Sequence, residues 1–142
     1  METVPNLFSV GINSGGLSPQ NREIHETLAL FQQEVIRERK QFLNDGLRVN
    51  LVFDIPGPIF QPDCEGLVAA RFDRKARHLL ITAAVPADLT ASGVNRYLVQ
   101  VLSGVVEQAR AVVLERRLAL AATNLELLVG RLVKARQAPA KD

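Results

Sequence analysis

The chain has 142 residues, 47% hydrophobic and 23% charged, with 17 lysines and arginines against 15 acids and a net charge of +2. This composition is typical of a folded globular domain and excludes the low hydrophobicity and high charge of a disordered chain. Because no secretory leader and no run of about 18 apolar residues is present, and Cys64 has no second cysteine to pair with, we expect a cytoplasmic protein without a membrane segment. We expect one domain over residues 1–142, with a loose tail over about residues 137–142.

The first third of the chain predicts a strand and a helix. Phe8, Val10 and Ile12 alternate with small or polar residues, which is the period of a half-buried strand. Residues 18–46 predict an amphipathic helix, because Ser-Pro is a typical helix start and Asn-Asp-Gly a typical stop. Its apolar stripe consists of Ile24, Leu28, Phe31, Val35 and Phe42.

The middle of the chain predicts three strands. From residue 47 to 55 the apolar residues again alternate, so that one face of this strand, including Phe53, should lie in the core. Residues 68–72 and 79–85 alternate in the same way around the polar break Asp-Arg-Lys-Ala, and we interpret them as a β-hairpin.

The last third predicts two helices. Residues 94–117 are apolar over more than one stripe, so their surplus apolar face must be covered by the final helix or by a second copy in a homodimer. Thr123 and Glu126 have the spacing of a capping box, which places the start of the final helix at this point. Leu127, Leu128 and Leu132 would then cover the surplus face.

The predicted order is strand, helix, three strands and two helices. Short connections between consecutive strands favour an antiparallel arrangement. We therefore expect an α+β fold, a two-layer sandwich in which three helices lie mainly on one face of an antiparallel four-stranded sheet.

Several kinds of chemistry have little support in these residues. The chain has two histidines and no C-x-x-C or H-E-x-x-H motif, so we expect no metal and no cofactor. The segment Gly-Ile-Asn-Ser-Gly-Gly lacks the lysine of a phosphate-binding loop. The basic run Arg-Phe-Asp-Arg-Lys-Ala-Arg over residues 71–77 sits on the tip of a hairpin, and with so small a net charge we do not expect nucleic acid as the partner.

One enzymatic alternative stays open. A small active site could be built from Asp54, Asp63, Cys64 and Glu65 together with His78, if the base lies within hydrogen-bond reach. No family signature surrounds Cys64, so an incidental thiol explains the same residues.

The loop Pro-Gly-Pro-Ile-Phe-Gln-Pro-Asp-Cys-Glu-Gly, residues 56–66, is better interpreted as a stiff recognition element. Its prolines reduce the entropy lost on docking, and an exposed Ile-Phe pair among acids could act as an apolar anchor with a polar rim. The competing interpretation is that the two apolar side chains fold under the loop into the core. The predicted partner-binding residues are Asp54, Ile59, Phe60, Asp63, Glu65, Arg71 and Arg74.

In size and plan, with a strand ending in Val-Asn-Leu-Val-Phe-Asp-Ile-Pro-Gly-Pro-Ile-Phe and a hairpin ending in Leu-Leu-Ile-Thr-Ala-Ala-Val-Pro, the chain resembles the small immunity proteins of bacterial polymorphic toxin systems. The resemblance implies a non-enzymatic protein that neutralises a toxin by stoichiometric binding. Many nuclease inhibitors are strongly acidic, whereas this chain is mildly basic, which argues against a nuclease as the target. A homo-oligomeric structural or regulatory subunit is a third interpretation.

Overall fold

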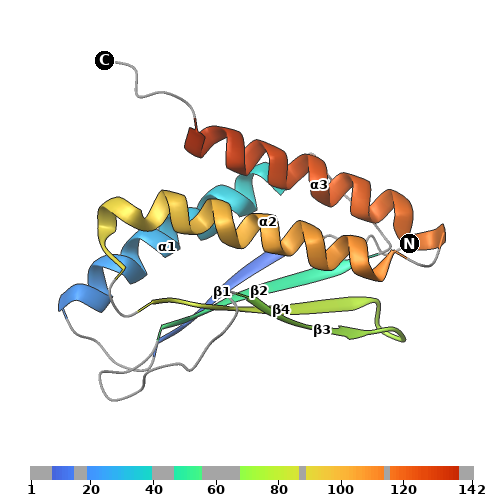
Figure 1. The fold of residues 1–142 in the computed structure, drawn as a ribbon, viewed down its shortest axis with the longest axis horizontal. Coiled ribbons are helices and arrows are strands. Elements are labelled where there is room, and N and C mark those ends of the chain that lie inside the picture. The colour runs from blue at the N-terminus through green and yellow to red at the C-terminus, as the bar shows by residue number, and fades with distance from the viewer. Residues whose placement is uncertain are drawn as a thin grey trace.

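The computed structural model describes residues 8–14, 19–39, 47–55, 68–86, 89–113 and 116–137 (Figure 1). Its elements in chain order are β1 (Phe8–Ser14), α1 (Pro19–Arg39), β2 (Arg48–Ile55), β3 (Val68–Asp73), β4 (His78–Ala84), the 3-10 turn η1 (Ala91–Gly93), α2 (Val94–Val112) and α3 (Arg116–Gln137). The predicted α+β fold, with three α-helices, four strands and this order of elements, is confirmed.

The four strands form a mixed sheet in the order β1-β2-β4-β3, and the predicted antiparallel sheet is wrong. β1, β2 and β4 run parallel, and only β3 is antiparallel to its neighbour β4. The prediction assumed that consecutive strands pair. Instead α1 connects β1 to β2 as a parallel crossover, and β3 takes the outer position so that β4 returns between β2 and β3.

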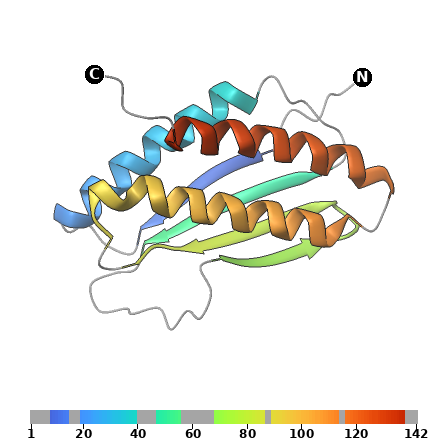
Figure 2. The same cartoon turned by 45° about the horizontal axis from the view of Figure 1, so that its top comes forward.

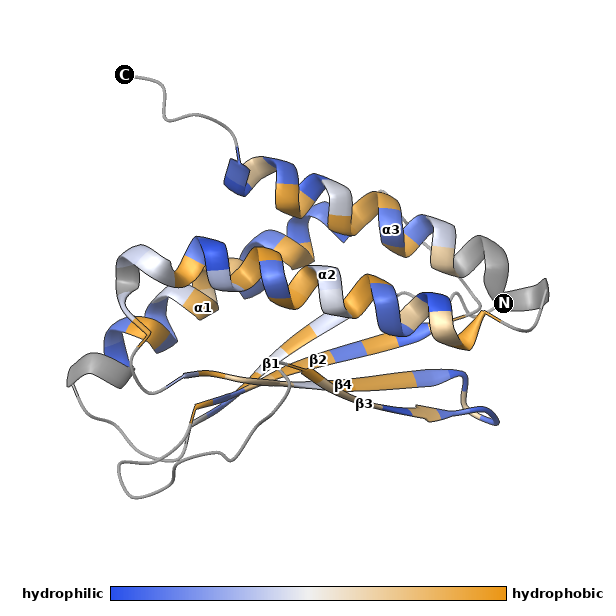
Figure 3. Cartoon of the chain, viewed as in Figure 1, coloured by the Kyte–Doolittle hydropathy of each residue, from blue (hydrophilic) through white to orange (hydrophobic). Residues whose placement is uncertain are grey.

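All three helices lie on the same side of the sheet (Figures 1 and 2). The sheet residues that face them are buried, as the alternation predicted: Leu47, Val49, Leu51, Phe53 and Ile55 in and before β2, and Leu79, Ile81 and Ala83 in β4. Orange, apolar segments of the strands and helices accordingly face each other in Figure 3. Among the helices of the described residues, none combines the length and the apolar character needed to cross a membrane.

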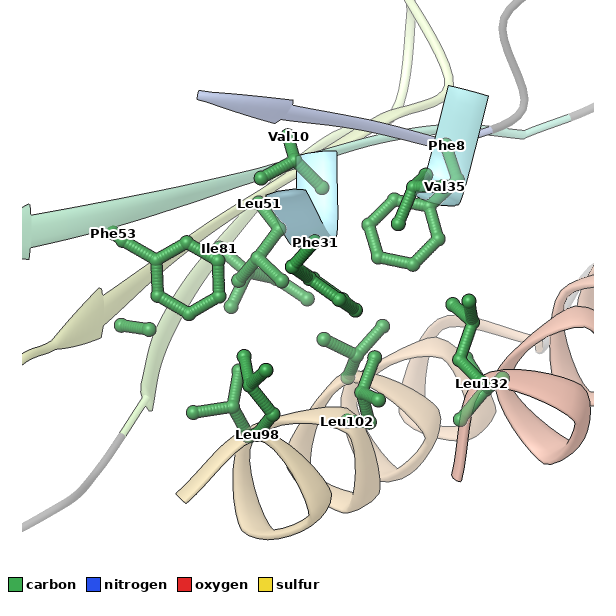
Figure 4. Packing of buried hydrophobic residues seen from close by; sticks show 14 of the residues in the cluster. Phe8, Val10, Phe31, Val35, Leu51, Phe53, Ile81, Leu98, Leu102 and Leu132 are labelled. Carbon is green, nitrogen blue, oxygen red and sulfur yellow. The ribbon is translucent and has the colours of Figure 1, made fainter. Parts of the chain in front are cut away.

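Aromatic side chains from α1, β2 and α2 meet in the core, and Figure 4 labels Phe31 and Phe53 among the buried residues around them. The rings of Phe31 in α1 and Phe53 in β2 are 6.0 Å apart in an edge-to-face arrangement. Phe53 is also 6.0 Å from the ring of Tyr97 in α2, whose hydroxyl donates to the carbonyl oxygen of Ala84 at 2.7 Å. Phe53 is 0% exposed, so its predicted orientation is confirmed.

The surplus apolar face of α2 is covered within the chain by α3. Leu128 and Leu132 are fully buried in the shared core, whereas Leu127 is 56% exposed and its predicted role is wrong. α3 begins at Arg116, so Thr123 lies inside the helix and the predicted capping box does not start it. The preceding residues, rich in alanine, leucine and arginine, are strong helix formers that extend the helix backwards.

α2 lies close against the first residue of β3. A Cβ atom at Gly104 would lie 2.7 Å from a methyl group of Val68. Further along β3, Ala70 faces the helix side by register with Ile81 but is exposed. The helices therefore cover the beginning of β3 and leave its middle uncovered, so the regular alternation predicted for this strand is only partly realised.

Candidate protein-binding surface

The side of the sheet opposite the helices is covered by no helix of the described residues, and we call it the open face. It carries every second residue of each strand. Its members are Ser9, Gly11, Asn13, Arg48, Asn50, Val52, Asp54, Ala69, Arg71, Asp73, His78, Leu80, Thr82 and Ala84.

The centre of the open face is apolar. Val52 in β2 and Leu80 in β4 are partly exposed, and the register places them on neighbouring strands one diagonal step apart. Gly11 lies beside Val52 on β1, and Thr82 and Ala69 follow in the same row on β4 and β3. A partner could therefore bury a small apolar patch made of Val52, Leu80 and the small side chains beside them.

Polar residues flank the apolar centre, and some of them are held in place by hydrogen bonds between strands. The Ser9 hydroxyl donates to the Asn50 side-chain oxygen, and the Asn13 side-chain amide donates to Asp54 Oδ1 at 3.1 Å. These bonds link β1 to β2 on the open face and fix the direction of the Asp54 carboxylate.

Positive charge gathers at the end of the open face that is opposite to Asp54, around the turn between β3 and β4. Asp73 Oδ1 accepts hydrogen bonds from the backbone N–H groups of Lys75 at 3.0 Å and Ala76 at 3.3 Å, so this carboxylate stabilises the turn. The cations around it are Arg48, Arg71, Arg74, Lys75 and Arg77. Within the described ranges, none of these five forms a salt bridge.

The predicted binding residues fall in three places. Arg71 lies on the open face and Arg74 in the adjacent turn, so the structure brings these two together. Asp54 is also on the open face, but its row is four residues along β4 from that of Arg71, about 13 Å away. Residues 59, 60, 63 and 65, predicted as Ile59, Phe60, Asp63 and Glu65 of the recognition loop, lie outside the described residues.

The structure separates two residues of the enzymatic alternative. His78 pairs with Arg48, and Asp54 pairs with Ala84, six residues further along the strands. This spacing is about 20 Å, far beyond the hydrogen-bond reach that general acid-base catalysis requires. Cys64 lies outside the described residues. In the part of the chain that is described, no group of three histidine, cysteine or carboxylate side chains could hold a metal ion.

The edge formed by β1 is partly closed by side chains of α1, which occupy two of its outward carbonyl groups. The Arg39 guanidinium donates to the carbonyl oxygen of Phe8 at 2.7 Å, and the Gln32 side-chain amide donates to that of Val10 at 2.6 Å. Neither residue belongs to the apolar stripe predicted for this helix, and neither was predicted to bind the sheet. Nothing local in the sequence could have revealed their role, because donor and acceptor are more than 20 residues apart.

A shallow groove of about 350 Å³ runs between α2 and α3. Val106, Val129 and Val133 line it, and an exposed ion pair between Arg110 and Glu126, at 2.9 Å, borders it. The groove contains none of the residues that the sequence indicated as binding residues.

Comparison with protein-family models, with curated proteins and with solved structures gives no match for this chain.

Proposed function

We propose that this protein is a non-enzymatic binding module that docks a protein partner on the open face of its sheet. The observation that carries the proposal is the composition of this face, with Val52 and Leu80 at an apolar centre and charged residues at both ends. An apolar centre inside a polar rim is the usual anatomy of a protein-protein interface. We further propose that the helices and the sheet are the two layers of a sandwich. The helices cover one face of the sheet, and the open face is left for a partner.

The size of the open face supports a partner that also contacts neighbouring elements. Between Arg48 and Asp54, and across four strands, it measures about 20 by 14 Å, or roughly 300 Å². A stable interface buries roughly 800 Å² on each partner. The turn after β3 is the proposed extension of the surface. Ile59, Phe60, Asp63 and Glu65 lie outside the described residues and stay predicted partner-binding residues.

The resemblance to immunity proteins suggests what the binding achieves. We propose that the chain neutralises a toxin by forming a stoichiometric complex, without turnover. The separation of Asp54 from His78 supports binding over catalysis by this pair, because groups about 20 Å apart cannot exchange a proton directly.

A growth-rescue experiment tests this function. The probe is the growth-inhibiting product of a toxin-like gene adjacent to the gene for this protein, co-expressed with the wild type and with two variants. Thr82→Arg places a bulky cation at an exposed position of the open face. Ala111→Arg is the control, because it places the same cation at an exposed position of α2, away from the open face. Thr82→Arg should abolish rescue and weaken the complex at least about tenfold, while Ala111→Arg should retain both.

Rescue without a one-to-one complex in native mass spectrometry would exclude inhibition by binding. Equal affinity of Thr82→Arg and wild type would move the interface away from the open face.

A further inference from the structure

The two edges of the sheet differ in the state of their main-chain groups. At β1, side chains of α1 occupy the outward carbonyl groups of Phe8 and Val10. At β3, no side chain of the described residues bonds to the outward main-chain groups. An edge with free N–H and C=O groups is a template for one more strand.

The residues of β3 that offer these groups follow from the register. The Val85 N–H donates to the carbonyl oxygen of Asp54, so Val85 points its main-chain groups toward β2. Main-chain groups of successive strand residues point to opposite neighbours, so Thr82 and Leu80 point toward β3, where their partners Ala69 and Arg71 complete the ladder. The groups that point away from β4 therefore belong to Val68, Ala70 and Phe72.

The charges along this edge indicate what kind of strand fits. Arg71, Arg74 and Lys75 are exposed on β3 and its turn, Arg77 follows them, and Asp73 is engaged by backbone N–H groups. We propose that β3 accepts an extended acidic segment of the protein partner as a fifth strand, with its carboxylates beside Arg71 and the turn. This inference rests on the proposed binding function and adds the segment that the small open face requires.

A second copy of the chain is a poorer occupant of the same edge. Antiparallel pairing of β3 with its own copy about the middle of the strand would bring the Arg71 side chains of the two protomers close together, and like charges across a strand pair are destabilising. Free N–H and C=O groups in strand geometry match a polypeptide backbone better than a nucleic acid. The observations therefore favour an acidic protein segment.

Ala70→Pro is the sharpest variant for the test. It removes an outward N–H while leaving the ladder to β4 intact, and proline is tolerated at a strand edge. Arg71→Glu reverses a charge at an exposed position and serves as a second variant that keeps the same backbone. Lys134→Glu, exposed in α3, is the matched control for the change in charge.

The first probe is the blocked peptide Glu-Val-Glu-Val-Thr-Val-Glu-Val-Glu, compared with the same peptide carrying lysine at every glutamate. Calorimetry should show binding of the acidic peptide alone. Amide exchange should slow at Ala70 and Phe72 but not in β1. Ala70→Pro and Arg71→Glu should each weaken binding at least about fivefold, and Lys134→Glu should leave it unchanged. Equal binding of both peptides in calorimetry, or slowed amide exchange outside β3, would overturn the inference. Self-association of the protein in sedimentation, with slowed exchange in β3, would also overturn it.

The second probe is the intact partner of the rescue experiment. If Thr82→Arg abolishes the complex and Ala70→Pro and Arg71→Glu do not weaken it, the binding function stands and the added strand is wrong. If none of these variants affects the complex, both proposals fall.

Discussion

Arg136, close to the end of α3, lies over the ring of Phe31 in α1, with its guanidinium carbon 4.7 Å from the ring centroid. The same guanidinium forms a two-pronged ion pair with Glu34 and donates to the carbonyl oxygen of Leu132 at 2.7 Å. The contacts with Phe31 and Glu34 join two helices that are about a hundred residues apart in the chain. The end of α3 is thus held to α1 by stacking and charge as well as by apolar packing.

Replacing Arg136 by alanine should lower the free energy of unfolding by about 2 to 3 kcal/mol. The change removes the cation over Phe31 and leaves the largely buried Glu34 carboxylate without its partner. Urea denaturation measures the effect. A matched pair separates the causes, because Arg136→Met with Glu34→Gln should be more stable than Arg136→Met alone. Equal stability of the two would show that the unpaired Glu34 carboxylate carries no penalty.

Two helical glycines should respond to alanine in opposite directions. Gly104→Ala forces a methyl group against Val68 and should destabilise the protein by about 1 to 2 kcal/mol despite the better helix propensity. A Cβ atom at Gly130 would meet only open space, and alanine favours the helix more than glycine does. Gly130→Ala should therefore stabilise the protein by about 0.5 to 1 kcal/mol. Thermal unfolding of both variants checks this. A stabilising Gly104→Ala would mean that α2 is not seated on β3.

Tyr97 should make the protein sensitive to alkali. Burial raises the pKa of the Tyr97 phenol above its ordinary value of 10.0, so the folded state retains the proton when the unfolded chain has lost it. The unfolded state then binds fewer protons, and the free energy of unfolding should fall as the pH rises above about 10.

Since the chain has one tyrosine and no tryptophan, phenolate absorbance reports this residue alone. In Tyr97→Phe the alkaline loss should be smaller, and the lost bond to Ala84 should cost about 1 kcal/mol at neutral pH. Ionisation near pH 10 in the folded protein would contradict the prediction.

Replacing Arg77 by glycine should increase the stability of the protein. Its φ of 51° lies in the left-handed region, and it is the one such non-glycine residue among those described. Because a side chain is unfavourable there, Arg77→Gly should stabilise the hairpin by about 0.5 to 1 kcal/mol. Arg74→Gly in the same turn is the control and should give no gain. The comparison of the two urea midpoints decides the matter.

Sequence periodicity predicted the faces of the elements well. The alternation around Phe53 was enough to place one side of β2 in the core, because this pattern is local. It could not predict which strands pair, since the pairing of β2 with β4 depends on contacts between residues that are distant in the sequence. The start of α3 was missed because the spacing of Thr123 and Glu126 also fits the interior of a helix.

The candidate surface was predicted in part. Asp54 and Arg71 were indicated by charge and do lie on the open face, but the apolar centre was not foreseen. On the open face of β2, Val52 is an apolar residue among polar ones. In β4, Leu80 follows Leu79, so the alternation of apolar and polar residues is broken. Both features are sequence signals of an apolar binding face. The partly closed edge of β1 depends on contacts between distant residues and leaves no such signal.

The partly closed edge of β1 also limits how the sheet can polymerise. Fibril growth by edge-to-edge stacking needs two free edges on every subunit, so that each addition creates a new site for the next. Here Gln32 and Arg39 occupy two outward carbonyl groups of the β1 edge, so a copy that pairs at β3 presents an obstructed edge to the next copy. These side chains would have to leave the β1 edge before a further copy could add, so the β3 edge that suits a partner does not by itself support continued stacking.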